Sequence, residues 1–185
     1  MEKSEKQKML AGELYRSNDP ELARDRAKAG EFLQIYNSTL AKEVNRRTEV
    51  LQALFAQVGS NIEIVPPLFC DYGSNIYVGD DVFINCGCVI LDCTSVRIGN
   101  KVLVGPSVQL YTASHPIDPE MRLAGLESAA PITIGNNVWI GGGAIICPGV
   151  TIGDNTTIGA GSVVTKDLPA RVVAVGNPCR VIRDV

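Results

Sequence analysis

Residues 132–168 read ITIGNNVWIGGGAIICPGVTIGDNTTIGAGSVVTKDL and carry an aliphatic residue at every sixth position. A small or polar residue follows each aliphatic, and a small or β-branched residue stands four positions after most of them. A period of six over this length is typical of a solenoid of short strands, the parallel β-helix. An ordinary sheet of short strands does not explain six consecutive aliphatic residues at a constant spacing of six. The aliphatic residues are Ile134, Ile140, Ile146, Ile152, Ile158 and Val164.

The repeat also predicts how each coil is built. Three hexads form one triangular coil of about 18 residues, in which the aliphatic side chains point inward and stack from coil to coil. The same step holds upstream in two further runs, separated by a slip of two residues around residues 92–95. We therefore predict a mainly β chain with a β-helix over residues 59–168, although the spacing alone does not give its hand. The upstream positions are Val78, Ile84 and Ile90, then Ile98, Val104 and Leu110.

The chain on either side of the repeat has a different character. Residues 1–58 are predicted to be helical, with Pro20 at the first position of one helix behind a polar capping residue. A second helix is expected to begin near residues 37–43 and to end at Gly59. Residues 169–185 are expected to form a C-terminal tail.

Composition excludes several classes of protein. The net charge of −3 and the isoelectric point near 5.2 argue against a nucleic-acid-binding surface, and the charged N-terminus is neither a signal peptide nor a membrane span. We expect a cytoplasmic protein whose six cysteines are reduced. The spacing of Cys86, Cys88 and Cys93 is not a zinc pattern, so no metal is expected.

Outward-facing residues form columns along the predicted prism. Because side chains alternate along a strand, the residue before each inward aliphatic points outward. Two of the three faces carry apolar columns, and two different apolar faces suit a head-to-tail contact that closes into a ring. We predict a homotrimer; the alternative is that the N-terminal helices cover one column. The columns are Phe83, Leu103, Trp139 and Thr157; Val89, Gln109, Ile145 and Val163; and, on the polar face, Tyr77, Arg97, Thr133 and Thr151.

One long interruption contains the only histidine of the chain. Ile134 lies 24 positions after Leu110 where one hexad step needs six, yet the phase resumes afterwards. The excess of 18 residues, about 114–131, contains three prolines and predicts a protruding loop instead of another helix. His115 stands where this loop leaves the scaffold, a common place for a functional residue. A histidine there is a candidate general base.

Four segments stand out beside the hexads: MLAGELYRSNDPEL (9–22), CDYGSNI (70–76), YTASHPIDP (111–119) and GNPCRVIR (176–183). Together with the hexads they resemble the maltose/galactoside O-acetyltransferases, a family of hexapeptide-repeat acyltransferases, and the maltose type most of all. The resemblance runs through essentially the whole chain. It implies a left-handed β-helix, a homotrimer and acetyl-CoA as the acetyl donor.

The resemblance also implies roles for two residues. His115 matches the histidine that removes the proton from a sugar hydroxyl, whose oxygen then attacks the acetyl-CoA thioester directly. Asn85 matches the residue that stabilises the resulting oxyanion; from the sequence alone it is equally well a corner residue that bonds to its own turn. Because the two lie near different corners of the prism, we expect neighbouring chains to supply them.

This chain differs from the family at some acceptor-binding positions, whereas its CoA-binding positions match. Ser17 and Asp71 match acceptor positions, but some members carry an acidic residue where this chain has Ser17. Cys93, with Asp92 beside it, is a second departure from the family pattern at an acceptor position. These two differences leave the identity of the acceptor open. Trp139 packs either beside CoA or in the trimer contact. The positions that match CoA-binding residues are Gly142, Ala160, Thr165, Lys166, Arg180 and Arg183.

The sequence therefore predicts an acetyl-CoA-dependent O-acetyltransferase acting on a small sugar such as maltose, glucose or a galactoside. Two alternatives stay open: a non-sugar hydroxyl acceptor, and a β-helix that serves only as a scaffold. A cysteine acyl-enzyme with Cys86, Cys88 or Cys93 as nucleophile is a weaker alternative. A β-helical carbonic anhydrase needs three histidines, and this chain has one.

Overall fold

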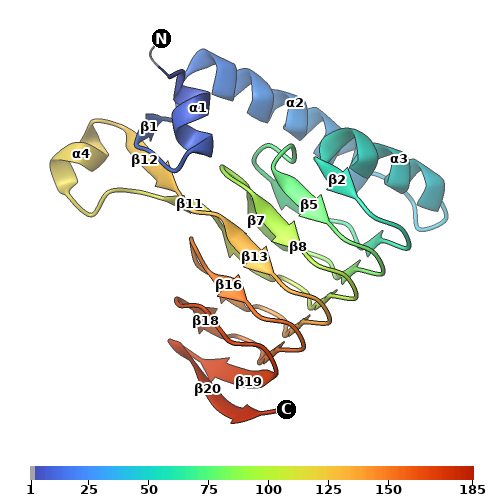
Figure 1. Cartoon of the computed structure of the whole chain (residues 1–185). Helices are drawn as coiled ribbons and strands as arrows, with labels where there is room; N and C mark the ends of the chain where they lie inside the picture. The colour runs from blue at the N-terminus through green and yellow to red at the C-terminus, as the bar shows by residue number, and fades with distance from the viewer. Residues whose placement is uncertain (1–2) are drawn as a thin grey trace.

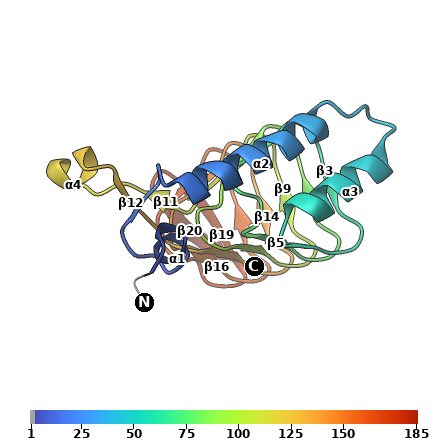
Figure 2. The same cartoon turned by 90° about the horizontal axis from the view of Figure 1, so that it is seen from above.

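The computed structural model describes residues 3–185 as a prism of stacked coils with helices laid across one end (Figure 1). The helices α1 (Glu5–Leu10), α2 (Pro20–Asn37) and α3 (Val44–Leu54) lie in the N-terminal part of the chain. Seen from above, α2 and α3 run over the top of the coils (Figure 2). Among the described residues, no helix combines the length and the apolar character needed to cross a membrane.

The strands of the coils stack into three sheets, which we call the first, second and third faces. The chain passes through the faces in that order, and all neighbouring strands are parallel except for one C-terminal hairpin. The first face holds β2 (Gln57–Val58), β5 (Ile76–Val78), β8 (Val96–Ile98), β13 (Ile132–Ile134) and β16 (Thr151–Ile152). The second holds β3 (Glu63–Ile64), β6 (Phe83–Ile84), β9 (Leu103–Val104), β14 (Trp139–Ile140), β17 (Thr157–Ile158), β19 (Val172–Gly176) and β20 (Cys179–Asp184). The third holds β4 (Leu68–Cys70), β7 (Cys88–Leu91), β10 (Gln109–Tyr111), β15 (Ile145–Ile146) and β18 (Val163–Val164).

The strand register confirms the predicted columns. On the second face Leu103 pairs with both Phe83 and Trp139, and Trp139 pairs with Thr157. The other two predicted columns are reproduced in the same way on the third and first faces. Leu103 and Trp139 are 50% and 56% exposed. The N-terminal helices therefore leave the second-face column uncovered, contrary to the alternative considered for it.

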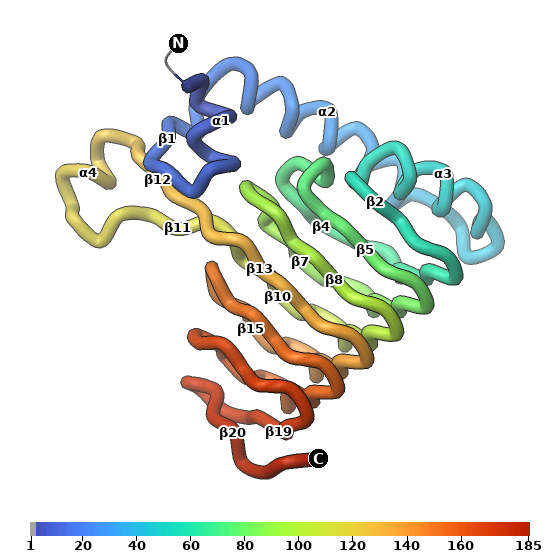
Figure 3. Tube along the Cα trace, in the orientation of Figure 1, coloured from blue at the N-terminus to red at the C-terminus, as the bar shows by residue number. Residues whose placement is uncertain are grey.

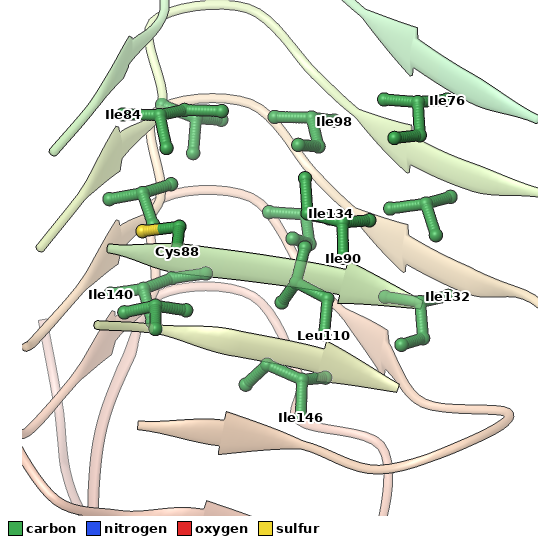
Figure 4. Packing of buried hydrophobic residues seen from close by; sticks show 14 of the residues in the cluster. Ile76, Ile84, Cys88, Ile90, Ile98, Leu110, Ile132, Ile134, Ile140 and Ile146 are labelled. Atoms are coloured by element: carbon green, nitrogen blue, oxygen red, sulfur yellow. The ribbon is translucent and has the colours of Figure 1, made fainter. Parts of the chain in front are cut away.

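The interior of the prism is a stack of aliphatic side chains (Figure 4). Ile84, Ile140 and Ile146 are at most 1% exposed, and each lies in register with an aliphatic residue of the next coil. Full burial of such a side chain stabilises the fold by about 1.5–3 kcal/mol. Regular stacking of β-branched residues is therefore what makes short strands of two to four residues stable together.

Coil length varies, and the variation falls at one corner. Paired residues are 20 positions apart in the upper coils, as for Gln57 and Tyr77, and 18 apart for Thr133 and Thr151. The extra residues all lie between the third and first faces, where the chain later inserts its long loop (Figure 3). The other two corners keep a constant length through these coils. One corner of the prism is thus free to carry additional structure.

The N-terminal segment differs in detail from its prediction. The second helix, α3, begins at Val44 because the preceding residues form a turn, in which the backbone N–H of Leu40 donates to Glu43 Oε2 at 2.7 Å. It ends at Leu54, before Gly59, because Phe55 adopts an extended backbone and β2 follows at once. The first coil therefore begins two residues earlier than predicted.

The C-terminal residues are more ordered than a tail. Residues 172–184 form the antiparallel hairpin of β19 and β20, and β19 pairs with β17 on the second face. The hairpin gives hydrogen-bond partners to the last coil strand, which would otherwise be an open edge. Backbone pairing of this kind has no hexad signal, so the repeat could not predict it.

The protruding loop contains a short helix and a strand that the sequence did not predict. Helix α4 (Pro119–Leu123) starts at the capping side chain of Asp118, which accepts from the backbone N–H of Met121. Strand β12 (Leu126–Ala129) pairs on one side with β11 (Ala113–Ser114) and on the other with β1 (Tyr15–Arg16). This three-stranded sheet joins the loop to the N-terminal segment.

Candidate active site

Asn85 lies at the corner between the second and third faces, which we call the groove corner (residues 85–87, 105–107, 141–143 and 159–161). It lines a groove of about 520 Å³ together with Trp139, Gly142 and Ala160. The remaining wall is mostly apolar and includes Phe83 and other residues of the second-face column. Four sequence-predicted site residues from three different coils therefore meet in one groove.

Glycine is required at this corner by the distance between coils. A Cβ on Gly141 would lie 2.4 Å from the backbone nitrogen of Ala160, and one on Gly105 would lie 2.5 Å from that of Gly142. No side chain fits at such a distance, so the coils stack backbone to backbone here. A ligand in the groove can consequently approach main-chain groups closely.

Asn85 combines the two roles that the sequence left open. Its Oδ1 accepts the backbone N–H of Cys86 at 2.8 Å, so it does bond to its own turn. The same bond fixes the amide so that Nδ2, a donor with two hydrogens, is left for another partner. Asn85 therefore presents an oriented hydrogen-bond donor at the groove corner.

The other predicted CoA-binding residues lie outside the residues that line the groove. Thr165 and Lys166 follow β18 and are exposed, as are Arg180 and Arg183 on β20. Arg180 Nη1 donates to the backbone oxygen of Cys179, its own neighbour. These four residues stand near the C-terminal end of the prism, where cationic side chains are accessible to an anion in solution.

His115 lies at the corner between the third and first faces, which we call the loop corner (residues 71–75, 92–95, 112–131 and 147–150). It directly follows β11 and is exposed. Among residues 3–185 it has no hydrogen-bond or ion-pair partner, so both ring nitrogens are available to a ligand. Within the same part of the chain, no three histidine, cysteine or acidic side chains come close enough to hold a metal ion.

Asp71 and Cys93 are neighbours at the loop corner. Cys93 Sγ lies 3.6 Å from Asp71 Oδ2 and donates to it. Burial raises the pKa of the Cys93 thiol to about 12 and also raises the pKa of Asp71. Burial likewise raises the pKa of Cys88. Cys93 and Cys88 are therefore protonated thiols at neutral pH, which argues against either as a nucleophile.

Asp92 holds the backbone of a turn at the loop corner, and its side chain is not exposed there. The residue is fully buried, and its Oδ1 accepts the backbone N–H groups of Asp71 and Tyr72 at 3.1 and 2.9 Å. Its Oδ2 accepts the backbone N–H of Asn75 at 3.2 Å. The expectation of direct contact with an acceptor is corrected for Asp92, because the side chain is completely buried while its oxygens bind the turn of the preceding coil.

Ser17 leads to a functional candidate that the sequence did not suggest. Its hydroxyl donates to Glu127 Oε1 at 2.7 Å, and the hydroxyl of Tyr15 donates to Glu127 Oε2 at 2.9 Å. Glu127 is on β12 of the protruding loop, 110 positions from Ser17. No motif or spacing signals a contact between such distant segments, so only the folded chain shows it.

Two groups of candidate residues thus form on one chain, at opposite edges of the third face. Asn85 precedes β7 and His115 follows β10, two neighbouring strands of that face. The groove corner offers a donor and an apolar groove, whereas the loop corner offers a free imidazole and carboxylates. His115 and Asn85 thus lie at different corners of one chain.

Comparison with protein families identifies two segments of the chain. Residues 8–59 match the maltose acetyltransferase hexapeptide capping motif, and residues 131–166 match the bacterial transferase hexapeptide of six repeats. The first segment runs from the end of α1 through α3 to β2, and the second covers the coils from β13 to β18.

Relatives match along the whole chain. Nodulation protein L of Rhizobium meliloti is 50% identical over 181 residues, covering 98% of this chain and 99% of that protein. Galactoside O-acetyltransferase of Escherichia coli is 44% identical over 179 residues, covering 97% of this chain and 88% of that protein.

Solved structures agree at the level of the fold. A maltose O-acetyltransferase from Clostridium difficile superposes with a TM-score of 0.98 at 50% identity, over 99% of this chain and 98% of that chain. A galactoside acetyltransferase in complex with coenzyme A gives 0.95 at 43% identity, over 99% and 92%. A hexapeptide-repeat acetyltransferase from Vibrio cholerae in complex with acetyl coenzyme A gives 0.91 at 38% identity, over 98% of each chain.

These likenesses extend from the capping segment to the C-terminal hairpin and confirm the left-handed β-helix. The chain therefore belongs to the maltose/galactoside O-acetyltransferase family of hexapeptide-repeat acyltransferases.

Proposed function

We propose that the protein transfers the acetyl group of acetyl-CoA to a hydroxyl of a small sugar such as maltose, glucose or a galactoside. The observation that carries this proposal is the full-length match to maltose and galactoside acetyltransferases, two of whose structural relatives hold coenzyme A or acetyl coenzyme A. The match includes the capping segment and the His115 loop, which a bare scaffold would not need. We place the reaction in the cytoplasm, in keeping with six unpaired cysteines.

His115 acts as the general base in this proposal. Its imidazole takes the proton of the acceptor hydroxyl while the hydroxyl oxygen attacks the thioester carbonyl carbon. The tetrahedral intermediate collapses, the carbon–sulfur bond breaks, and the proton passes from His115 to the leaving thiolate. The absence of any partner for the ring within residues 3–185 supports this role, because an imidazole engaged elsewhere would be a poorer base.

Asn85 stabilises the oxyanion of that intermediate. Its Oδ1 is occupied by the Cys86 N–H, so the side chain can meet a developing negative charge only through Nδ2. A donor fixed before the reaction costs no reorganisation when the charge appears. This preorganisation follows from the tight turn at the groove corner.

We propose that the active form is a homotrimer and that each site is shared by two chains. A base and an oxyanion donor at different corners of one prism meet if the groove corner of one copy faces the loop corner of the next. The exposed apolar columns support such a contact, because the half-exposed Leu103 and Trp139 on the second face need a cover. Phe69 on the third face is 48% exposed and supplies a second, different apolar surface.

CoA occupies the groove in this arrangement. Gly142 and Ala160 line it and leave room for a narrow pantetheine arm, and Trp139 supplies an aromatic wall. The phosphates of CoA lie toward the C-terminal end, where side chains of suitable charge are exposed. The residues proposed for that end are Thr165, Lys166, Arg180 and Arg183.

The acceptor sugar lies at the loop corner. Asp71 offers a half-buried carboxylate, and Cys93 beside it is a weak donor that helps to hold that carboxylate. Ser17 contributes through its hydrogen bond to Glu127. A sugar with several hydroxyl groups can donate hydrogen bonds to these oxygen atoms.

Acetyl-CoA turnover with maltose, glucose and a β-galactoside tests the proposal directly. We expect acetylated product with at least one sugar and CoA released in equal amount. Product formation should be lost in His115→Ala, whose folded state should be unchanged because the side chain is exposed. No product with any sugar, or an active His115→Ala variant, would contradict the proposal.

A further inference from the structure

Glu127 is held firmly in place by two segments that meet at the loop corner. Both carboxylate oxygens are occupied, Oε1 by the hydroxyl of Ser17 and Oε2 by the hydroxyl of Tyr15, at 2.7 and 2.9 Å. Tyr15 is completely buried in a small core that also contains Cys93 and Ala129. Two hydroxyl bonds from a buried support fix the rotamer of Glu127, as expected for a side chain that must meet a ligand in one orientation.

The strand register brings Glu127 next to His115. Ser114 on β11 pairs with Ser128 on β12, and β12 is antiparallel to β11. His115 directly follows Ser114 at the end of β11, and Glu127 directly precedes Ser128 on β12, so both residues adjoin this last pair. Glu127 therefore lies at the same end of the three-stranded sheet as the proposed general base, and its charge acts on Asp71.

Two carboxylates, Asp71 and Glu127, share this corner with one cationic side chain, Arg26. Among residues 3–185 neither Asp71 nor Glu127 takes part in an ion pair. Arg26 donates to the hydroxyl of Tyr72 and to the backbone oxygen of Ser17, and its positive charge lowers the pKa of Asp71, so it offsets one of the two negative charges. Burial raises the pKa of Asp71, and the negative charge of Glu127 adds to that rise. The loop corner therefore has an excess of negative charge in a half-buried setting.

We propose that Glu127 is a specificity-determining residue that selects acceptors by charge. Together with Asp71 it favours a sugar that carries an ammonium group beside its hydroxyls over the corresponding neutral sugar. This inference rests on the proposed function, because it assigns the acceptor class of that same site.

The chemistry of transfer is compatible with such an acceptor. An ammonium group held between carboxylates stays protonated and has no lone pair with which to attack a thioester. The acetyl group therefore goes to a hydroxyl oxygen, which loses its proton to His115, and the product is an O-acetyl amino sugar together with CoA. The amine remains free and charged in the product.

Three sugars with the same ring distinguish this proposal: 2-amino-2-deoxyglucose, its N-acetylated form and glucose. They are compared at mildly acidic pH, where the amine is protonated, and at low and high salt. We expect kcat/KM to be highest for the amino sugar, mainly through a lower KM, and the preference to shrink as salt is raised. NMR of the product should show an ester and a free amine.

Glu127→Gln removes the charge and keeps an oxygen and a similar shape. We expect it to reduce the preference for the amino sugar over glucose about tenfold, equivalent to about 1.4 kcal/mol. Glu120→Gln, in α4 of the same loop, is the matched control, because Glu120 is exposed and its side chain has no hydrogen bond or ion pair among residues 3–185. It should leave the preference intact. Ser17→Ala keeps the Glu127 charge and should lower the preference less than Glu127→Gln.

The outcomes separate the two proposals. If the protein acetylates sugars but prefers the neutral ones, or if Glu127→Gln leaves the preference unchanged, the inference is wrong and the proposed function stands. An N-acetylated product would also overturn it. If none of these sugars, nor maltose or a galactoside, accepts an acetyl group, both proposals fail together.

Discussion

The groove corner and the loop corner belong to the same prism but are built on opposite principles. At the groove corner, glycines such as Gly141 let coils touch backbone to backbone, and the repeat allows no extra residue. At the loop corner the chain adds two residues in the upper coils and a long loop further down, and buried polar groups such as Asp92 hold the turns. Regular stacking makes a groove, whereas departures from the repeat make a polar recognition surface.

His115→Ala tests the loop corner and should have the largest effect on activity. Removal of a general base lowers kcat by about 10²–10⁴-fold. Steady-state kinetics with acetyl-CoA and an accepted sugar measure the loss, and thermal unfolding should be unchanged. Ser114→Ala, at the adjacent exposed position, is the control and should retain activity. A comparable loss in both variants would show that the loop and not the imidazole matters.

Asn85→Ala tests the groove corner, with a somewhat smaller effect. Loss of one oxyanion donor lowers kcat by about 10²–10³-fold. Asn85→Asp sharpens the result, because an aspartate still accepts the Cys86 N–H but offers no donor to the oxyanion. Both variants should fold and both should be slow. An active Asn85→Asp variant would limit the role of Asn85 to its turn.

Gly141→Ala tests the claim that the groove corner tolerates no side chain. The new Cβ would lie 2.4 Å from the backbone nitrogen of Ala160, and we expect a loss of about 1–3 kcal/mol in the free energy of unfolding. Gly30→Ala is the matched control in α2, where nothing lies within 4 Å of the added Cβ. That change should stabilise the helix by up to about 1 kcal/mol. Denaturant unfolding of both variants distinguishes them.

Asp92→Asn tests the polar construction of the loop corner and should have the smallest effect. Burial raises the pKa of Asp92 from 3.8 to about 6, so the folded state binds this proton more tightly than the unfolded state. The contribution of this group to stability is fully present below 3.8 and is lost as the pH rises through about 6. The difference in unfolding free energy between wild type and variant should therefore change across this window. A constant difference would contradict the assignment.

The contrast between the corners also explains what the sequence could and could not predict. Stacked coils repeat their neighbours, so six-residue spacing was enough to assign Trp139 and its column to one face and to place Asn85 at a corner. The loop corner has no repeat. Its contacts join segments far apart in the chain, as when Ser17 and Tyr15 hold Glu127, and these depend on folding of the whole N-terminal segment.

The same reasoning accounts for the errors. Asp92 stands beside a family acceptor position, but the direction of its side chain is set by the turn of the preceding coil, which spacing does not describe. The C-terminal hairpin and the start of α3 at Val44 depend on backbone pairing and on local turns. Each of these features lies outside the regular hexads.

The central claim is that each active site combines the groove corner of one chain with the loop corner of its neighbour. Mixed trimers of His115→Ala and Asn85→Ala chains, formed by refolding the two inactive variants together, test it most directly. In a cyclic trimer with equal random mixing, about one quarter of the sites receive an intact His115 from one chain and an intact Asn85 from the next. We predict recovery of about one quarter of wild-type turnover; mixed trimers without any recovered activity would contradict the claim.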